Sequence, residues 1–265
     1  KFLIVLFNFL RICYYRLRYW YPFWFWILNG KRLKTVILKS EIEKRIVNDL
    51  NKNGIAFTNL DELGFSLDIL LKHFFEKKKT ANIQTNKDFL FYLWDVKPKI
   101  DLSNPFFQFI GQDSIRRIVE SYMGMEARFY YMTLNITTPV KESPKLSQRW
   151  HRDPEDPKLI KVFVYLNDVD ENNGPFMFVR SSQYGGKWRW VALQQPPKGS
   201  YPLDGFVESK VNEKDILTCR GKKGTVIFAD ITGLHKGGFA KKSERWMFTG
   251  GFTSYASHWP KLLTE

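Results

Sequence analysis

Two histidines and one aspartate in this sequence are candidates for a metal-binding or catalytic site. His151 and Asp153 stand one residue apart in the stretch SQRWHRD (147–153), where a β-like segment runs into PEDP. The chain holds only four histidines. A His-x-Asp triplet also arises by chance, and its alternative interpretation here is a polar strand end that enters a turn. Other residues must therefore decide between the two interpretations.

The second histidine, His235, follows a predicted strand in GTVIFADITGLHKGGF (224–239). Two neutral imidazoles and one carboxylate on one face of a metal leave three coordination positions open, which is the facial triad of non-haem Fe(II) oxygenases. Those open positions suit a chelating cosubstrate and dioxygen. Arg245 begins the last predicted strand, and a guanidinium binds the far carboxylate of an anionic cosubstrate through two hydrogen bonds. The four residues together point to metal-dependent oxidation.

The ordered combination resembles the phytanoyl-CoA dioxygenase family of 2-oxoglutarate oxygenases. The run WHRDPEDPKLIKVFVYLNDVDENNGPFMFVRSSQ (150–183) is similar to the family core, which has a His-x-Asp motif, a strand and an Asn-Gly-Pro turn. A Gly-Thr-Val-x-Phe strand then leads to the distal histidine and the arginine. The resemblance covers residues 125–252 of the sequence.

This resemblance implies a double-stranded β-helix and a hydroxylase that uses Fe(II), 2-oxoglutarate and O2. The implied metal ligands are His151, Asp153 and His235, and the implied 2-oxoglutarate ligand is Arg245. The implied substrate is a small molecule or is lipid-like. Asp153 favours hydroxylation, because radical halogenases of similar fold replace this carboxylate with Gly or Ala.

Departures from the family pattern limit what the resemblance carries over. Val-Arg-Ser-Ser-Gln (179–183) replaces the usual Pro-Gly-Ser-His, so any role of that histidine is absent. Met247 stands where related oxygenases pair the arginine with a serine, so a second group that holds the cosubstrate must come from elsewhere. Gly251 stands where nucleic-acid demethylases of the superfamily carry a second arginine, which disfavours nucleic acid as a partner.

Asn135 and Lys161 are further candidates for cosubstrate binding. Asn135 lies in LNITTP (134–139), which is similar to a segment of ectoine-hydroxylase-like members whose asparagine reaches 2-oxoglutarate. Its alternative interpretation is a strand-end residue in a turn. Lys161 is a charge on an otherwise apolar and aromatic strand face. Inside a barrel it would need an anion, either 2-oxoglutarate or an acidic substrate; pointing outward it would be a solvated charge, and we favour the outward orientation.

Helices followed by short strands must position these residues. Apolar periodicity predicts helices over 40–53, 66–79 and 113–123 and a short strand over 55–57. Alternation and aromatic or β-branched content predict strands over 128–136, 159–166, 176–179, 224–228 and 245–252. This order predicts an α+β, β-rich chain, with the N-terminal helices outside a closed or sandwiched sheet.

A long irregular insertion is predicted over 181–211, and long loops in compact domains are usually functional or disordered. We expect it to cover the pocket, because binding residues gather on loops held by a rigid scaffold. Its tyrosines and tryptophans could pack an apolar or sugar-like body. Nearby cations indicate an anionic group on the substrate: Lys187, Arg189, Lys236 and Lys241.

Composition excludes some classes of function. The chain has 265 residues, of which 44% are hydrophobic and 26% charged, as in folded globular proteins. Cys13 and Cys219 allow at most one disulfide and no thiolate zinc site, which favours a reducing, cytoplasmic interior. A net charge of +14 suits nucleic acid, anionic lipid or acidic small molecules. The sequence shows neither a basic-region helix nor zinc-finger spacing, so direct base readout has no support.

The first thirty residues differ from the rest. An apolar stretch, KFLIVLFNFL, is followed by arginines and by the aromatic YWYPFWFWILNG (19–30). No uncharged run reaches the ~18 residues of a membrane span. Such a segment suits the lipid headgroup boundary; the alternative is a helix packed on the main domain. We expect an N-terminal segment over 1–30 with peripheral membrane contact and a dioxygenase domain over 31–265.

A second function stays open beside the dioxygenase. It is a catalytically inactive, membrane-associated binding module that retains the same barrel. The N-terminal segment supports this alternative. Its weakness is that the residues of the implied metal site and the arginine are all present in the sequence.

Overall fold

The computed structural model describes residues 6, 7, 9, 10, 13, 28, 35–80, 83–84, 87–94, 100–141, 143–193, 201–255 and 257. Most of the predicted N-terminal segment 1–30 therefore lies outside the described residues, as do residues 194–200 of the predicted insertion. In the part of the chain that is described, no helix combines the length and the apolar character needed to cross a membrane.

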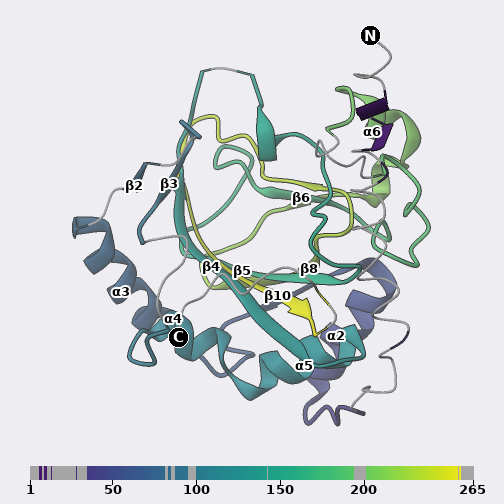
Figure 1. Cartoon of the computed structure of the whole chain (residues 1–265). Coiled ribbons are helices and arrows are strands. Elements are labelled where there is room, and N and C mark those ends of the chain that lie inside the picture. Colours follow the sequence, from purple (N-terminus) through teal and green to yellow (C-terminus); the bar gives the residue numbers. More distant parts are fainter. Residues whose placement is uncertain are drawn as a thin grey trace.

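Two antiparallel sheets form the β-rich centre of the described chain (Figure 1). The larger has seven strands in the order β1-β8-β5-β10-β4-β3-β2, and the smaller has three in the order β7-β6-β9. The large sheet comprises β1 (Ile55–Asn59), β2 (Ile83–Gln84), β3 (Leu90–Tyr92), β4 (Ala127–Thr137), β5 (Leu159–Tyr165), β8 (Thr225–Asp230) and β10 (Arg245–Ser254). The small sheet comprises β6 (Phe176–Val179), β7 (Ile216–Cys219) and β9 (His235–Lys236). This is the predicted double-stranded β-helix.

Helices cover the outer face of the large sheet (Figure 1). They are α2 (Glu41–Asn53), α3 (Leu67–Thr80), α4 (Pro105–Ile110) and α5 (Asp113–Met123). Helix α2 begins after Ser40, whose hydroxyl accepts a hydrogen bond from the Glu43 N–H at 3.2 Å, as a helix cap requires. Phe106 of α4 stacks on Phe248 of β10 with ring centroids 4.9 Å apart. The predicted arrangement of helices outside a barrel is confirmed.

Alternation along β5 separates two apolar cores. Ile160, Val162 and Val164 pack with the helices, whereas Leu159, Phe163 and Tyr165 pack with strands of the small sheet. Because successive side chains of a strand point to opposite faces, Lys161 shares the inward face. The favoured outward orientation of Lys161 is wrong: its side chain lies inside the barrel and is only 19% exposed.

The longer predicted elements agree with the structure to within a few residues at each end, and the errors lie in the short ones. Strands β2, β3, β7 and β9 and helix α4 were not predicted, because two to six residues carry little periodicity. The predicted irregular insertion 181–211 contains a short helix, α6 (Phe206–Lys210). Both cysteines are free.

Candidate metal centre

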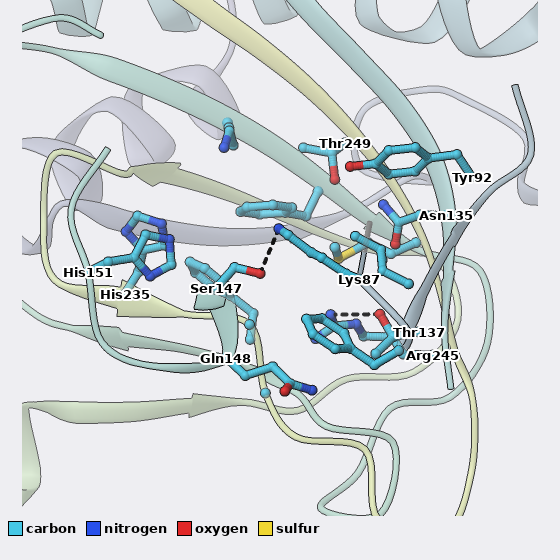
Figure 2. Close-up of a pocket in the computed structure, with 18 of the residues that line it drawn as sticks. Lys87, Tyr92, Asn135, Thr137, Ser147, Gln148, His151, His235, Arg245 and Thr249 are labelled. Atoms are coloured by element: carbon cyan, nitrogen blue, oxygen red, sulfur yellow. Dashed lines mark hydrogen bonds between the residues drawn. The ribbon is translucent and has the colours of Figure 1, made fainter. Parts of the chain in front are cut away.

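His151, Asp153 and His235 converge in the structure, and their potential ligand atoms all lie within 4.8 Å of one another. His151 Nε2 is 3.6 Å and His235 Nε2 is 3.8 Å from Asp153 Oδ1. The two histidines form a β-bridge: the His151 N–H donates to the His235 carbonyl at 2.9 Å, and the His235 N–H donates to the His151 carbonyl at 3.0 Å. This backbone pairing brings two distant parts of the sequence together at one site (Figure 2).

Each imidazole is held in the tautomer that a metal needs. His151 Nδ1 lies 2.8 Å from the Arg149 carbonyl, and His235 Nδ1 lies 2.9 Å from the Gly233 carbonyl. Because a carbonyl oxygen can only accept, each Nδ1 carries the proton and each Nε2 keeps its lone pair. Burial lowers the pKa of His151, and burial together with the neighbouring His151 lowers the pKa of His235 to about 3. Both side chains are therefore neutral at neutral pH, which is the form that a metal ligand requires.

Asp153 completes the set as an ionised carboxylate. Its Oδ2 accepts a hydrogen bond from Lys161 Nζ at 2.8 Å. Burial alone would raise the pKa of Asp153, but the Lys161 ammonium outweighs it and holds that pKa well below its usual range. Burial would lower the pKa of Lys161, and Asp153 reverses this and raises it. The structure thus gives Lys161 an anion inside the barrel, and that anion is Asp153.

Arg245 lies at the start of β10 and is a buried cation, with 4% of its surface exposed. Its Nη1 donates to the Gly174 carbonyl, and its Nη2 donates to Thr137 Oγ1 at 3.2 Å. Its Nε has no partner among the described residues, and no described carboxylate forms an ion pair with it. Burial lowers the pKa of Arg245, but a guanidinium stays charged in proteins. A charge buried in this way requires an anion.

A cavity of about 150 Å³ joins the two histidines to Arg245. The histidines lie at one end and Arg245 with Thr137 at the other, with Lys87 between them (Figure 2). Lys87 Nζ donates to Ser147 Oγ at 3.0 Å. The cavity is smaller than the ~300–1,000 Å³ pockets that hold drug-sized ligands. Its size and its charges suit a small dicarboxylate whose one end chelates a metal.

Asn135 also reaches this cavity from β4. Its Nδ2 donates to Thr133 Oγ1 at 3.3 Å, and its Oδ1 has no partner among the described residues. It is therefore a buried side chain with unused hydrogen-bonding capacity at the cavity wall, not a strand-end residue in a turn. All six residues singled out in the sequence lie in or beside one site.

Some residues of the site were not predicted. Lys87 lies in a loop, Ser147 lies in a three-residue 3-10 helix (Leu146–Gln148), and Thr137 is the last residue of β4, so neither Lys87 nor Ser147 belongs to a periodic pattern. The position of Gly174 was indicated by the sequence, because Asn-Gly-Pro (173–175) marks a turn. Gly174 has φ 68°, and a Cβ there would collide with the backbone of Gly238 and Ala240. That close approach holds its carbonyl at Arg245.

The predicted insertion lies beside the centre. The ring centroid of Tyr201 is 5.7 Å from that of His151. Arg152, the residue between two of the candidate ligands, donates to the carbonyls of Trp188 at 3.1 Å, Val191 at 2.9 Å and Thr232 at 2.7 Å. The Arg152 guanidinium therefore connects the His-x-Asp segment, through hydrogen bonds, both to the insertion and to the loop that precedes His235.

A family model described as phytanoyl-CoA dioxygenase (PhyH) matches residues 40–245 of the chain. No curated protein sequence matches it at a significant level. Among solved structures, the chain is similar to SnoN, a non-heme alpha ketoglutarate dependent epimerase from nogalamycin biosynthesis. The sequence identity is 13% and the TM-score is 0.57, and the match covers 80% of this chain and 81% of SnoN.

The chain is also similar to EctD from S. alaskensis, whose structure contains 2-oxoglutarate and 5-hydroxyectoine. The sequence identity is 15% and the TM-score is 0.57, and the match covers 87% of this chain and 82% of EctD. A third similar structure is HygX from Streptomyces hygroscopicus with nickel, 2-oxoglutarate and hygromycin B bound. The sequence identity is 11% and the TM-score is 0.53, and the match covers 82% of this chain and 88% of HygX. At these identities the likeness shows a common fold.

The lowered imidazole pKa values predict how acid affects metal binding. Protons compete with a metal only near and below the pKa of the ligand, and here both pKa values lie below the ordinary 6.5. We expect the affinity for Co²⁺, followed by its visible absorption, to stay nearly constant from about pH 8 to about pH 6.5 and to fall only in stronger acid. A tenfold loss of affinity between about pH 7.5 and about pH 6.5 would contradict this assignment.

Proposed function

Since the chain belongs to the phytanoyl-CoA dioxygenase family, which its match over residues 40–245 establishes, we propose that it is an Fe(II)- and 2-oxoglutarate-dependent dioxygenase that hydroxylates a small-molecule or lipid-like substrate. One observation carries the proposal. Arg245 is a buried cation without an anion among the described residues, and it faces a His-Asp-His centre across a single cavity. A cosubstrate with a chelating end and a far carboxylate satisfies both ends of that cavity.

The donor set fits Fe(II). Two imidazole nitrogens and one carboxylate oxygen form the facial triad, with positions left open for reactants. The same three donor types also hold zinc in some hydrolases. Arg245 favours the oxygenase, because a zinc-bound water needs no anionic cosubstrate and would leave the buried guanidinium unpaired.

Each residue has a distinct proposed role. His151, Asp153 and His235 bind the metal, and Arg245 binds the far carboxylate of 2-oxoglutarate. When bound, Fe(II) and 2-oxoglutarate supply the oxidation: O2 is consumed, 2-oxoglutarate becomes succinate and CO2, and a substrate C–H becomes C–OH. The Thr137 hydroxyl, 3.2 Å from Arg245 Nη2, provides the second polar contact that Met247 cannot offer. Asn135 adds its carboxamide from the cavity wall.

The insertion supports an anionic or lipid-like substrate. Tyr184 and Trp190 are 46% and 67% exposed. Arg189 lies over the Trp190 ring at 4.1 Å, and Lys187 lies over the Trp188 ring at 4.3 Å. Exposed aromatic faces bordered by cations suit a ligand that has an apolar body and a negative group.

The assay for this function is O2-dependent succinate formation. The Fe(II)-loaded protein, screened against acidic and lipid-like metabolites, should convert 2-oxoglutarate to succinate and add one oxygen atom to its substrate. His151→Ala should abolish this turnover, because one of three protein ligands is lost. His73→Ala is the matched control, since His73 packs against Phe106 with ring centroids 6.0 Å apart and is not part of the centre.

Equal loss of turnover in both histidine variants would count against the centre, as would absence of succinate from the wild-type protein with every substrate. A product with unchanged mass and inverted stereochemistry would place the chain with epimerases and not with hydroxylases.

Arg245→Ala should separate cosubstrate binding from metal binding. We expect the metal to bind as in the wild type, while 2-oxoglutarate binding weakens by about 2–5 kcal/mol, or roughly thirty- to several-thousand-fold. The affinity of Arg245→Lys for 2-oxoglutarate should lie between those of the wild type and Arg245→Ala, because the positive charge stays and the bidentate hydrogen bonding is lost. Calorimetric titration of 2-oxoglutarate into the Co²⁺-loaded proteins measures this. Unchanged affinity in Arg245→Ala would remove the arginine from the cosubstrate site.

We also propose that residues 1–30 contact membranes peripherally, at the cytoplasmic face, beside a catalytic domain over 31–265. The sequence pattern supports this, as do exposed apolar side chains at Phe7, Phe9 and Leu10, with 67%, 60% and 56% of their surface accessible. Changing these three residues to Ser in the full chain should reduce cosedimentation with anionic lipid vesicles and leave metal binding intact.

Equal cosedimentation of the wild-type and substituted proteins would mean that the segment does not bind lipid. Vesicle binding by a wild-type protein that never turns over 2-oxoglutarate would instead favour the inactive binding module.

A further inference from the structure

The two carboxylate oxygens of Asp153 face different partners. Oδ1 lies 3.6 Å and 3.8 Å from the Nε2 atoms of His151 and His235, whereas Oδ2 lies 2.8 Å from Lys161 Nζ. Only 16% of the Asp153 side chain and 19% of the Lys161 side chain are exposed. The carboxylate is therefore oriented so that one oxygen faces the metal site and the ammonium holds the other.

The sheet fixes Lys161 in that place. On β5 it is in register with Ala229 of β8 and Gly251 of β10, so small neighbours on both sides leave room for its long side chain. Lys161 Nζ also lies 5.3 Å from the centre of the Tyr131 ring. A rigid strand therefore directs the ammonium to the carboxylate oxygen that faces away from the imidazoles.

Coordination chemistry gives this orientation a consequence. With two imidazoles and one carboxylate oxygen bound, a six-coordinate metal keeps three open positions, and a carboxylate bound through both oxygens would leave two. A chelating 2-oxo acid fills two positions, so O2 can bind only if the carboxylate uses one oxygen. A charge-assisted hydrogen bond to the second oxygen keeps it from the metal.

We propose that Lys161 is a positioning residue that holds Asp153 as a one-oxygen ligand and thereby keeps the third position open. This rests on the proposed metal centre. It differs from the role that the sequence left open for an inward Lys161, in which the ammonium would bind 2-oxoglutarate or an acidic substrate.

Counting the water molecules on a bound Mn²⁺ tests this role without any turnover, because each open position of the metal holds one water. Proton relaxation of water by the Mn²⁺-loaded wild-type protein should correspond to three bound waters. Lys161→Met, which keeps the chain length and removes the charge, should lower the bound-water relaxation by about one third as Oδ2 joins the metal. Lys161→Arg should restore the wild-type value.

Lys87→Met is the matched control, since it removes another cavity ammonium whose Nζ bonds Ser147 and not Asp153. The control should keep three waters, because among the described residues the hydrogen bond to Oδ2 comes from Lys161. Loss of one water in both Met variants would show an effect of cavity charge and overturn the proposal.

The remaining outcomes separate this proposal from the metal centre itself. Mn²⁺ that fails to bind the wild type, or that binds His151→Ala equally well, would reject the centre. Mn²⁺ that binds the centre with two waters in the wild type, or with three in Lys161→Met, would reject the role of Lys161 while the centre stands. If Lys161→Met does not fold, the number of waters on Mn²⁺ in the wild-type protein tests the proposal, and two waters would reject it.

Discussion

The backbone pairing of His151 with His235 is the interaction on which the rest of the site depends. Each histidine donates its main-chain N–H to the carbonyl of the other, at 2.9 Å and 3.0 Å. Each also turns its Nδ1 to the carbonyl two residues before it, Arg149 for one and Gly233 for the other. The pair therefore brings both Nε2 atoms close to Asp153 Oδ1, at 3.6 Å and 3.8 Å, and Asp153, two residues after His151, offers the third potential donor.

Electrostatics then sets what the cavity accepts. Arg245 and the lysines Lys87 and Lys161 line its wall, while Asp153 is the acid of the metal set and is already paired with Lys161. Burial removes the solvent that would otherwise stabilise these charges, so anionic ligands are favoured inside. The barrel is rigid around this charge distribution because the inner faces of both sheets share one apolar cluster. The fold thus holds cations in fixed places, as a cosubstrate carboxylate requires.

Much of this arrangement could be predicted from the sequence, because the signals were local. The His-x-Asp spacing, the strand before His235 and the alternation of residues 159–166 each describe a short stretch. Together they predicted the sheet and the residues that the structure brings together at the candidate site. The resemblance to a family supplied the order in which these stretches combine. The separation of Ile160 and Val162 from Phe163 and Tyr165 into two cores follows directly from the two-residue period of a strand.

The errors have physical reasons. Alternation placed Lys161 on the aromatic face, but whether that face was inside depended on the location of the second sheet, which three short strands form. Lys87 contributes through a loop, and Thr137 contributes through strand pairing opposite Arg245, so neither has a local pattern. The hydrogen bonds of Arg152 to the insertion depend on tertiary packing alone. Lys161 is a charge in the middle of an aromatic strand face, and this feature of the sequence could have indicated a buried ion pair.

An anaerobic titration of the Fe(II)-loaded protein with 2-oxoglutarate, followed by visible absorption, tests the proposed metal and cosubstrate site. A 2-oxo acid chelated to Fe(II) gives a metal-to-ligand charge-transfer band, so we expect this band to appear and to saturate at one 2-oxoglutarate per protein. Absence of the band in a folded protein that binds Fe(II), or a protein that takes up zinc and excludes Fe(II), would show that the cavity is not an Fe(II) and 2-oxoglutarate site.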